Sequence, residues 1–149
     1  MRAITDALLH LILKGNKMGL DMYAFAVSAK DAGDNVVDLQ TNYGTDNEIK
    51  TTELFYWRKF NALHGWMENL YRLKGGAKAS FNCTTVRLDA KDLDRLEMDT
   101  GNNKLVPING FFFGVTEIYP EDLESVADFV AKARQALADG NAVYYDSWW

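Results

Sequence analysis

The stretch that decides the fold is Tyr56–Lys74, which reads YWRKFNALHGWMENLYRLK. Its large apolar residues recur at steps of four, three, four and three, a spacing that places them on one stripe of an α-helix. The members of this stripe are Tyr56, Phe60, Leu63, Met67 and Leu70. Gly75 and Gly76 follow directly and are typical of a helix end. The pattern predicts a helix over 56–74 with its apolar stripe buried.

Four short segments around this helix are rich in aromatic and β-branched residues and predict strands. They are 22–27, 86–88, 110–116 and 143–149. The segment 110–116 is apolar on both faces, so we expect it at the centre of a sheet or along a pocket. By contrast, 30–50 is mostly polar and predicts a long loop with room for one weak strand.

Two further helices begin at recognisable signals. Asp89 is a good N-cap and predicts a helix to about Met98, with Asp92 in its first turn. Pro120 suits the first position of a third helix, which Gly140 closes. Since helices alternate with strands, we expect an α+β fold, a small and mainly antiparallel sheet with about three helices packed on it. The single domain spans 18–149.

Composition excludes several classes of function. The chain has 149 residues, a net charge of −5 and a pI near 5.0, which disfavours binding to duplex nucleic acid. Its one cysteine, Cys83, and two histidines do not make a zinc site, so we expect no metal and no cofactor. The low cysteine content also favours a reducing, cytosolic compartment.

The first seventeen residues form a separate N-terminal extension. Their apolar cluster is too short to span a membrane, and the charged end of the segment does not fit a signal-peptide cleavage site. One interpretation is a short amphipathic helix with Ile4, Leu8, Leu11 and Ile12 on one stripe. The other is that 1–17 is not native sequence, because Lys14–Lys17 matches a translated ribosome-binding site and Met18 offers a second start.

The predicted helix also carries a polar stripe. Trp57, Asn61 and His64 lie at helical spacing and together can stack a planar ring, hydrogen-bond to it and move a proton. Arg58 and Lys59 at the helix start can bind an anion. These five residues are the candidate ligand-binding set. The structural alternative is that Trp57 packs in the core, His64 is a buried histidine and the two cations face solvent.

Phe112 and Asp21 complete the candidates. Phe112 lies between Gly110 and Gly114 and is either part of an apolar ligand wall or part of a core strand. Asp21 sits in an apolar run and is either a buried partner of Arg58 or Lys59 or simply the polar residue before a strand. If the protein is an enzyme, His64 is the general acid or base, oriented by Asp21 or by Glu68.

Several segments, taken together, resemble a widespread group of small, mostly uncharacterised bacteriophage proteins. They are 18–23 (MGLDMY), 56–66 (YWRKFNALHGW), 110–114 (GFFFG) and the aromatic end at 144–148. The group usually begins at the MGLDMY segment. This chain departs from it at Phe60 and Gly65, where the group often has alanine and a bulkier residue. The resemblance implies a phage origin and a role in the host cytoplasm, and no named activity.

Two functions remain from the sequence. The first is a phage accessory protein that acts in the infected cell by binding, with a counter-defence role as one form of it. Its partner is either a small anionic, nucleotide-like ligand or a host protein, with no duplex nucleic acid and no membrane. The alternative is a small hydrolase or transferase that uses His64 as general acid or base. The absence of a recognisable triad, metal set or phosphate loop favours the binding function.

Overall fold

The protein has an α+β fold built on a four-stranded antiparallel sheet in the order β2-β1-β4-β3. The computed structural model describes residues 19–107 and 117–149. The strands are β1 (Asp21–Ser28), β2 (Thr51–Arg58), β3 (Val86–Leu88) and β4 (Asn141–Trp148). Strand β1 pairs along its length with β2 on one side and β4 on the other. The described sheet thus confirms the expected fold class.

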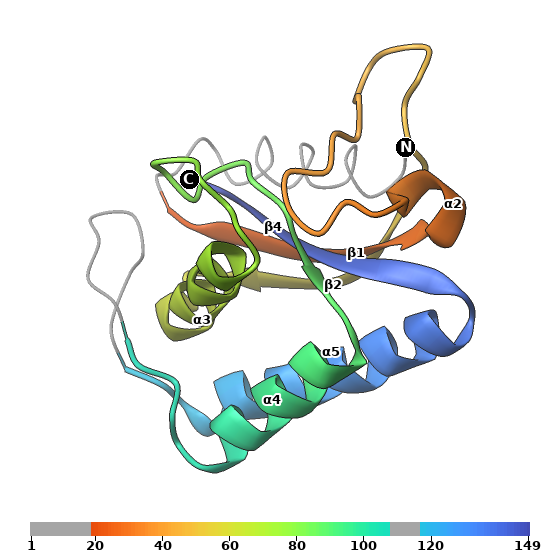
Figure 1. The fold of residues 1–149 in the computed structure, drawn as a ribbon. Helices are drawn as coiled ribbons and strands as arrows, with labels where there is room; N and C mark the ends of the chain where they lie inside the picture. Colours follow the sequence, from red (N-terminus) through yellow and green to blue (C-terminus); the bar gives the residue numbers. More distant parts are fainter. Residues whose placement is uncertain (1–18, 108–116) are drawn as a thin grey trace.

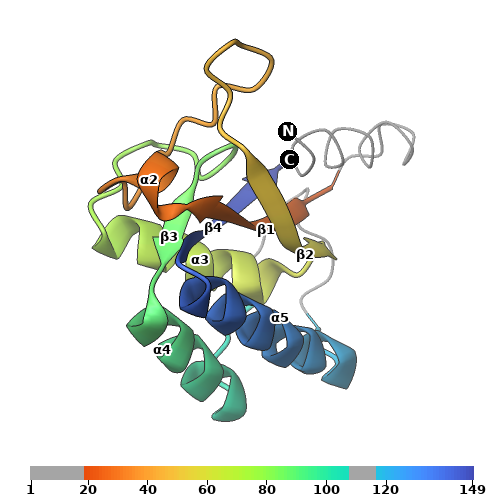
Figure 2. The ribbon, with the colours of Figure 1, turned by 90° about the vertical axis from the view of Figure 1, so that its right-hand side faces the viewer.

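Three long helices cover one face of this sheet (Figures 1 and 2). They are α3 (Asn61–Leu73), α4 (Ala90–Gly101) and α5 (Pro120–Ala138). The one-turn helix α2 (Ala29–Ala32) and the connection that follows it lie toward the opposite face (Figure 2). Because strand side chains alternate between faces, every second residue of β1 points to the long helices. The main core lies in that layer.

The core of α3 follows the predicted stripe. Phe60, Leu63, Met67 and Leu70 are all buried between the helix and the sheet. They pack in one apolar cluster with Met22 and other residues of the helix-covered sheet face. A smaller cluster on the other face joins Phe25, Val27, Ala142 and Tyr144 to α2 and the loop after it, in contact with Ala32, Leu39 and Ile49.

The predicted start of this helix is wrong. Residues 56–58 belong to β2, and α3 begins only at Asn61. The physical reason is long-range pairing: Tyr56 and Arg58 lie opposite Tyr23 and Asp21 of β1. Lys59 then adopts a positive φ of 59°, which turns the chain out of the strand, and its N–H donates to the Leu20 carbonyl at 2.7 Å.

Other predicted elements agree with the structure. Strands β1 and β3 cover the expected segments, and β4 covers the expected 143–149 except Trp149. Asp89 caps α4 through a capping box with Asp92, and α4 runs past Met98 to Gly101. Pro120 is the first residue of α5. The loop expected over 30–50 contains one helical turn and one isolated bridge, Val37 to Val86. The expected strand 110–116 and the extension 1–17 lie outside the described residues.

Candidate functional site

Trp57 and Arg58 are neighbours on β2, so their side chains point to opposite faces of the sheet. Trp57 faces the helices and is buried, with 5% of its surface exposed. Its indole Nε1–H donates to the Ser125 hydroxyl at 3.0 Å, and its ring meets that of Phe129 edge-on at 5.2 Å. The indole is therefore a core side chain that fixes α5 against the sheet. Its ring face is not presented to solvent.

His64 is buried in the same layer, between the helices and the sheet. It is 1% exposed, and its Nδ1 lies 2.7 Å from the hydroxyl oxygen of Tyr145 on β4. The imidazole also packs against the Phe81 ring at 5.1 Å. Burial lowers the pKa of His64 to about 4, so the ring is neutral at neutral pH. This geometry suits a structural histidine that orders the interface between α3 and β4.

Asp21 forms a charged cluster on the opposite face of the sheet. Its Oδ1 accepts from Arg58 Nη1 at 2.7 Å and from the Tyr56 hydroxyl at 2.5 Å. Asp21 is fully buried, and its Oδ2 has no hydrogen-bond partner among the described residues. Of the two sequence interpretations, the structure supports Asp21 as the buried partner of Arg58. Burial raises the pKa of the Tyr56 hydroxyl, and its hydrogen bond to Asp21 raises it further.

The two carboxylates expected to orient His64 are engaged elsewhere. Asp21 binds Arg58 on the other face of the sheet, and Glu68 pairs with Arg72 on α3 at 3.3 Å. The described contacts therefore offer no carboxylate–histidine pair built from these residues. General acid–base chemistry at His64 also needs access for a substrate, which a side chain 1% exposed does not provide.

The remaining candidates are divided among different environments. Asn61 is buried at the first residue of α3, whereas Lys59 is exposed. The Arg58 and Lys59 side chains pack over Gly19, where a Cβ would lie 2.7 Å from each of them. The structure thus joins Arg58 to Asp21 and places Trp57, Asn61 and His64 in the helix-covered layer. One shared ligand wall, as the helical stripe implied, is not formed. Phe112 lies outside the described residues.

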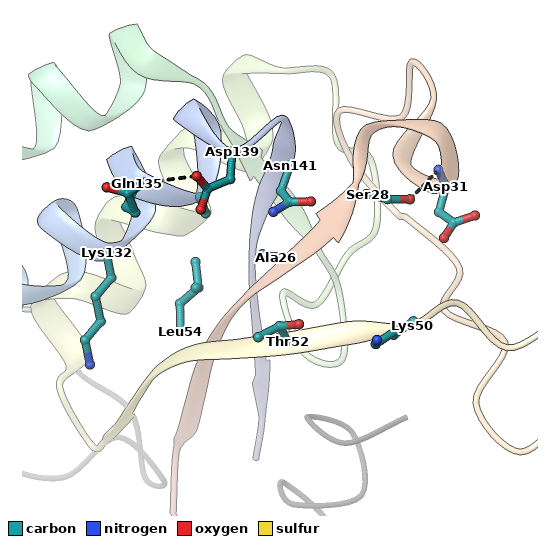
Figure 3. A pocket seen from close by; sticks show the side chains of 11 residues that line it. Ala26, Ser28, Asp31, Lys50, Thr52, Leu54, Lys132, Gln135, Asp139 and Asn141 are labelled. Carbon is teal, nitrogen blue, oxygen red and sulfur yellow. Dashed lines mark hydrogen bonds between the residues drawn. The ribbon is translucent and has the colours of Figure 1, made fainter.

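A groove lies between α5 and β2 at the end of the sheet nearest α2 (Figure 3). Its volume is about 490 Å³. The β2 side supplies residues at every second position, which share one face of the extended chain. The α5 side supplies residues at helical spacing, which share one face of the helix. The lining residues on these two sides are Lys50, Thr52, Leu54, Lys132, Gln135, Ala136 and Asp139.

The groove has an apolar floor and a rim of mixed charge. The apolar lining residues are Ala26 of β1, Leu54 and Ala136, while Ser28, Asp31 and Asn141 close the end near α2. Two cations and two carboxylates stand on the rim, and the Gln135 amide donates to Asp139 at 3.0 Å. An apolar floor with several polar groups around it is the composition expected of a binding site.

The sequence contained a signal for this groove that the predicted elements missed. Thr51–Trp57 reads TTELFYW and is rich in β-branched and aromatic residues, which favours a strand. Tyr56 happens to lie four positions before Phe60, so the helical spacing of the apolar residues continues into the strand by coincidence. The predicted helix takes only 56–58 of β2, and 51–55 was assigned to no element, so the face formed by Thr52 and Leu54 was missed.

Comparison with known protein families, curated proteins and solved structures gave no significant match to this chain. Within 19–107 and 117–149, no helix has the length and apolar content needed to cross a bilayer. The same described residues contain no group of three or more histidine, cysteine or acidic side chains placed to hold a metal ion.

Proposed function

We propose that this protein is a bacteriophage accessory protein that acts in the infected host cell by binding a host protein, and that the groove between α5 and β2 is the binding site. The observation that carries this proposal is the groove itself. It combines an apolar floor with side chains from α5, β1, β2 and the α2 end of the fold. The phage origin rests on the resemblance of the sequence segments.

The exposure of the residues that line the groove favours a protein partner over a small ligand. Sites for small molecules usually enclose most of the ligand surface. Most residues that line this groove are exposed, so a small molecule in it keeps part of its surface in water, whereas a protein segment continues beyond both ends of the groove and covers its rim. The mixed charges of the rim also match a polypeptide, which carries side chains of both signs, better than a nucleotide.

Burial of the aromatic and imidazole candidates supports binding over catalysis. The ring of Trp57 is packed on Phe129, and His64 is in contact with Tyr145 and Phe81. A nucleotide needs an accessible ring to stack on, and a hydrolase needs an accessible base. Neither side chain meets that need in this arrangement.

Site-directed photo-crosslinking tests the proposal. A photoreactive amino acid at Thr52, on the groove wall, is expected to give one dominant adduct with a host protein. The same amino acid at Lys91, on the exposed surface of α4, serves as the control and is expected not to give that adduct. Identical adduct patterns at both positions would contradict the proposed site.

A panel of nucleotides distinguishes binding of a small ligand from binding of a host protein. At a concentration 100 times the dissociation constant, a ligand stabilises the fold by about 2.7 kcal/mol, which raises Tm by roughly 5–10 °C in a domain of this size. The proposal predicts no such shift with nucleotides or dinucleotides. A clear shift that the Thr52→Trp substitution abolishes would instead establish the groove as a small-ligand site.

A further inference from the structure

The groove has a direction, because β2 and α5 run in opposite senses. Strand β2 is antiparallel to β1, which is antiparallel to β4, so β2 and β4 are parallel. Helix α5 leads into β4 through the turn at Asp139 and Gly140 and packs back along the sheet (Figure 1). The start of β2 therefore lies beside the C-terminal end of α5. In agreement, the Lys132 Nζ lies over the Phe55 ring at 5.4 Å, farther along β2.

The two ends of the groove differ in charge. Asp31 and Asp139 border the end nearest α2, together with one cation, Lys50. The C-terminal end of α5 points there as well and carries no basic residue in its last turn, so its partial negative charge adds to the two carboxylates. Lys132 borders the other end. The groove is thus net negative near α2 and positive at Lys132, with Ala26 and Ala136 between them.

The length of the groove matches a short extended segment. Lys132 and Asp139 are seven positions apart on α5, which corresponds to about 10.5 Å along the helix. In an extended chain, side chains on one face are about 6.7 Å apart, so three of them span about 13 Å. Three alternate side chains therefore reach from one charged end to the other across the apolar floor. Strand β2 has β1 as its neighbour among the described strands, so its far side is an edge of the described sheet.

We infer that the groove binds an extended segment of the partner that presents a basic, a small apolar and an acidic side chain at alternate positions. The basic side chain lies between Asp31 and Asp139, the apolar one contacts Ala26 and Ala136, and the acidic one meets Lys132. This inference rests on the proposed function and adds the chemistry of the partner and its orientation.

Selection from a random peptide library displayed on a carrier tests both the proposed binding site and the inferred chemistry of the bound segment. The full-length protein is immobilised, and binders are tested again on two variants. Thr52→Trp fills the groove from an exposed position, and Ala131→Trp places the same ring on an exposed part of α5 away from the groove lining. We expect peptides that bind the wild type and Ala131→Trp but lose at least tenfold in affinity for Thr52→Trp. Circular dichroism verifies that both variants fold.

The sequences of those peptides decide the inference. The expected consensus has a basic residue and an acidic residue four positions apart, with a small apolar residue midway. Lys132→Glu is expected to weaken binding about fivefold, and exchanging the acidic residue of the peptide for lysine is expected to restore it, while Lys91→Glu has no effect. Groove-dependent peptides without this charge pattern would overturn the inference and leave the proposed function in place. Binding that ignores Thr52→Trp would overturn the proposed site as well.

Discussion

Replacing His64 by alanine separates a structural histidine from one that serves a site. The imidazole is buried against Phe81, and its Nδ1 lies 2.7 Å from the Tyr145 hydroxyl. Removing it opens a cavity and takes one hydrogen-bond partner from a buried hydroxyl, and the second effect costs up to about 1–3 kcal/mol. We therefore expect His64→Ala to cost about 2–4 kcal/mol. That is comparable to the cost of about 2–5 kcal/mol expected for the buried neighbour Leu63→Ala.

Urea unfolding and thermal melting, followed by circular dichroism, measure both losses. For a domain of this size each kcal/mol lowers Tm by roughly 2–4 °C, so His64→Ala is expected to melt about 5–15 °C below the wild type. A double-mutant cycle with Tyr145→Phe isolates the contact and should give a coupling of about 1–2 kcal/mol. If His64→Ala costs less than about 1 kcal/mol while Leu63→Ala costs several, the imidazole faces an accessible pocket and the structural assignment is refuted.

Three further outcomes follow from the same geometry. Arg58→Met is expected to lower the free energy of unfolding by about 2–4 kcal/mol, because it leaves the fully buried Asp21 carboxylate without its cation. Asp21→Asn should cost less, because the Arg58 side chain is 21% exposed and keeps some contact with water, and urea unfolding compares the two variants. Between about pH 6.5 and pH 4 the lowered pKa of His64 contributes a loss of stability as pH falls, because the unfolded chain binds a proton that the folded protein excludes, whereas the buried Asp146, whose pKa is raised to about 6, contributes the opposite slope. His64→Gln removes the first contribution, so its unfolding free energy, relative to that of the wild type, should rise as pH falls across that range. Gly76→Ala should destabilise by about 1–3 kcal/mol, because the new Cβ would lie 2.2 Å from a buried tyrosine ring, whereas Gly101→Ala, with open space around it, should leave Tm nearly unchanged.

The parts of the fold readable from sequence are those set by local signals. Asp89 and Pro120 mark helix starts through their own side-chain chemistry, and both positions agree with the structure. The buried stripe from Phe60 to Leu70 is also local, since its spacing belongs to α3 alone. Fold class follows from the alternation of such segments.

The missed strand shows where local reasoning fails. Tyr56 and Arg58 are held in β2 by pairing with a strand more than thirty positions earlier, and this pairing overrides a helical spacing that continues through them. The candidate site failed for the same reason. Once Trp57 lies on a strand, it no longer shares a face with Asn61 and His64. For Asp21 the sequence left two interpretations open, and the structure supports the buried partner of Arg58, since an isolated carboxylate in an apolar run needs a cation.

Amide chemical-shift mapping of the isotopically labelled protein, titrated with a peptide selected on it, tests the central claim most directly. We expect the largest shifts on the two walls of the groove, at 52–54 in β2 and at 132–139 in α5 and its C-cap, with little change on α4. Saturable shifts centred on α4 or on β3, with the groove amides unchanged, would show that the partner binds elsewhere and would contradict the account.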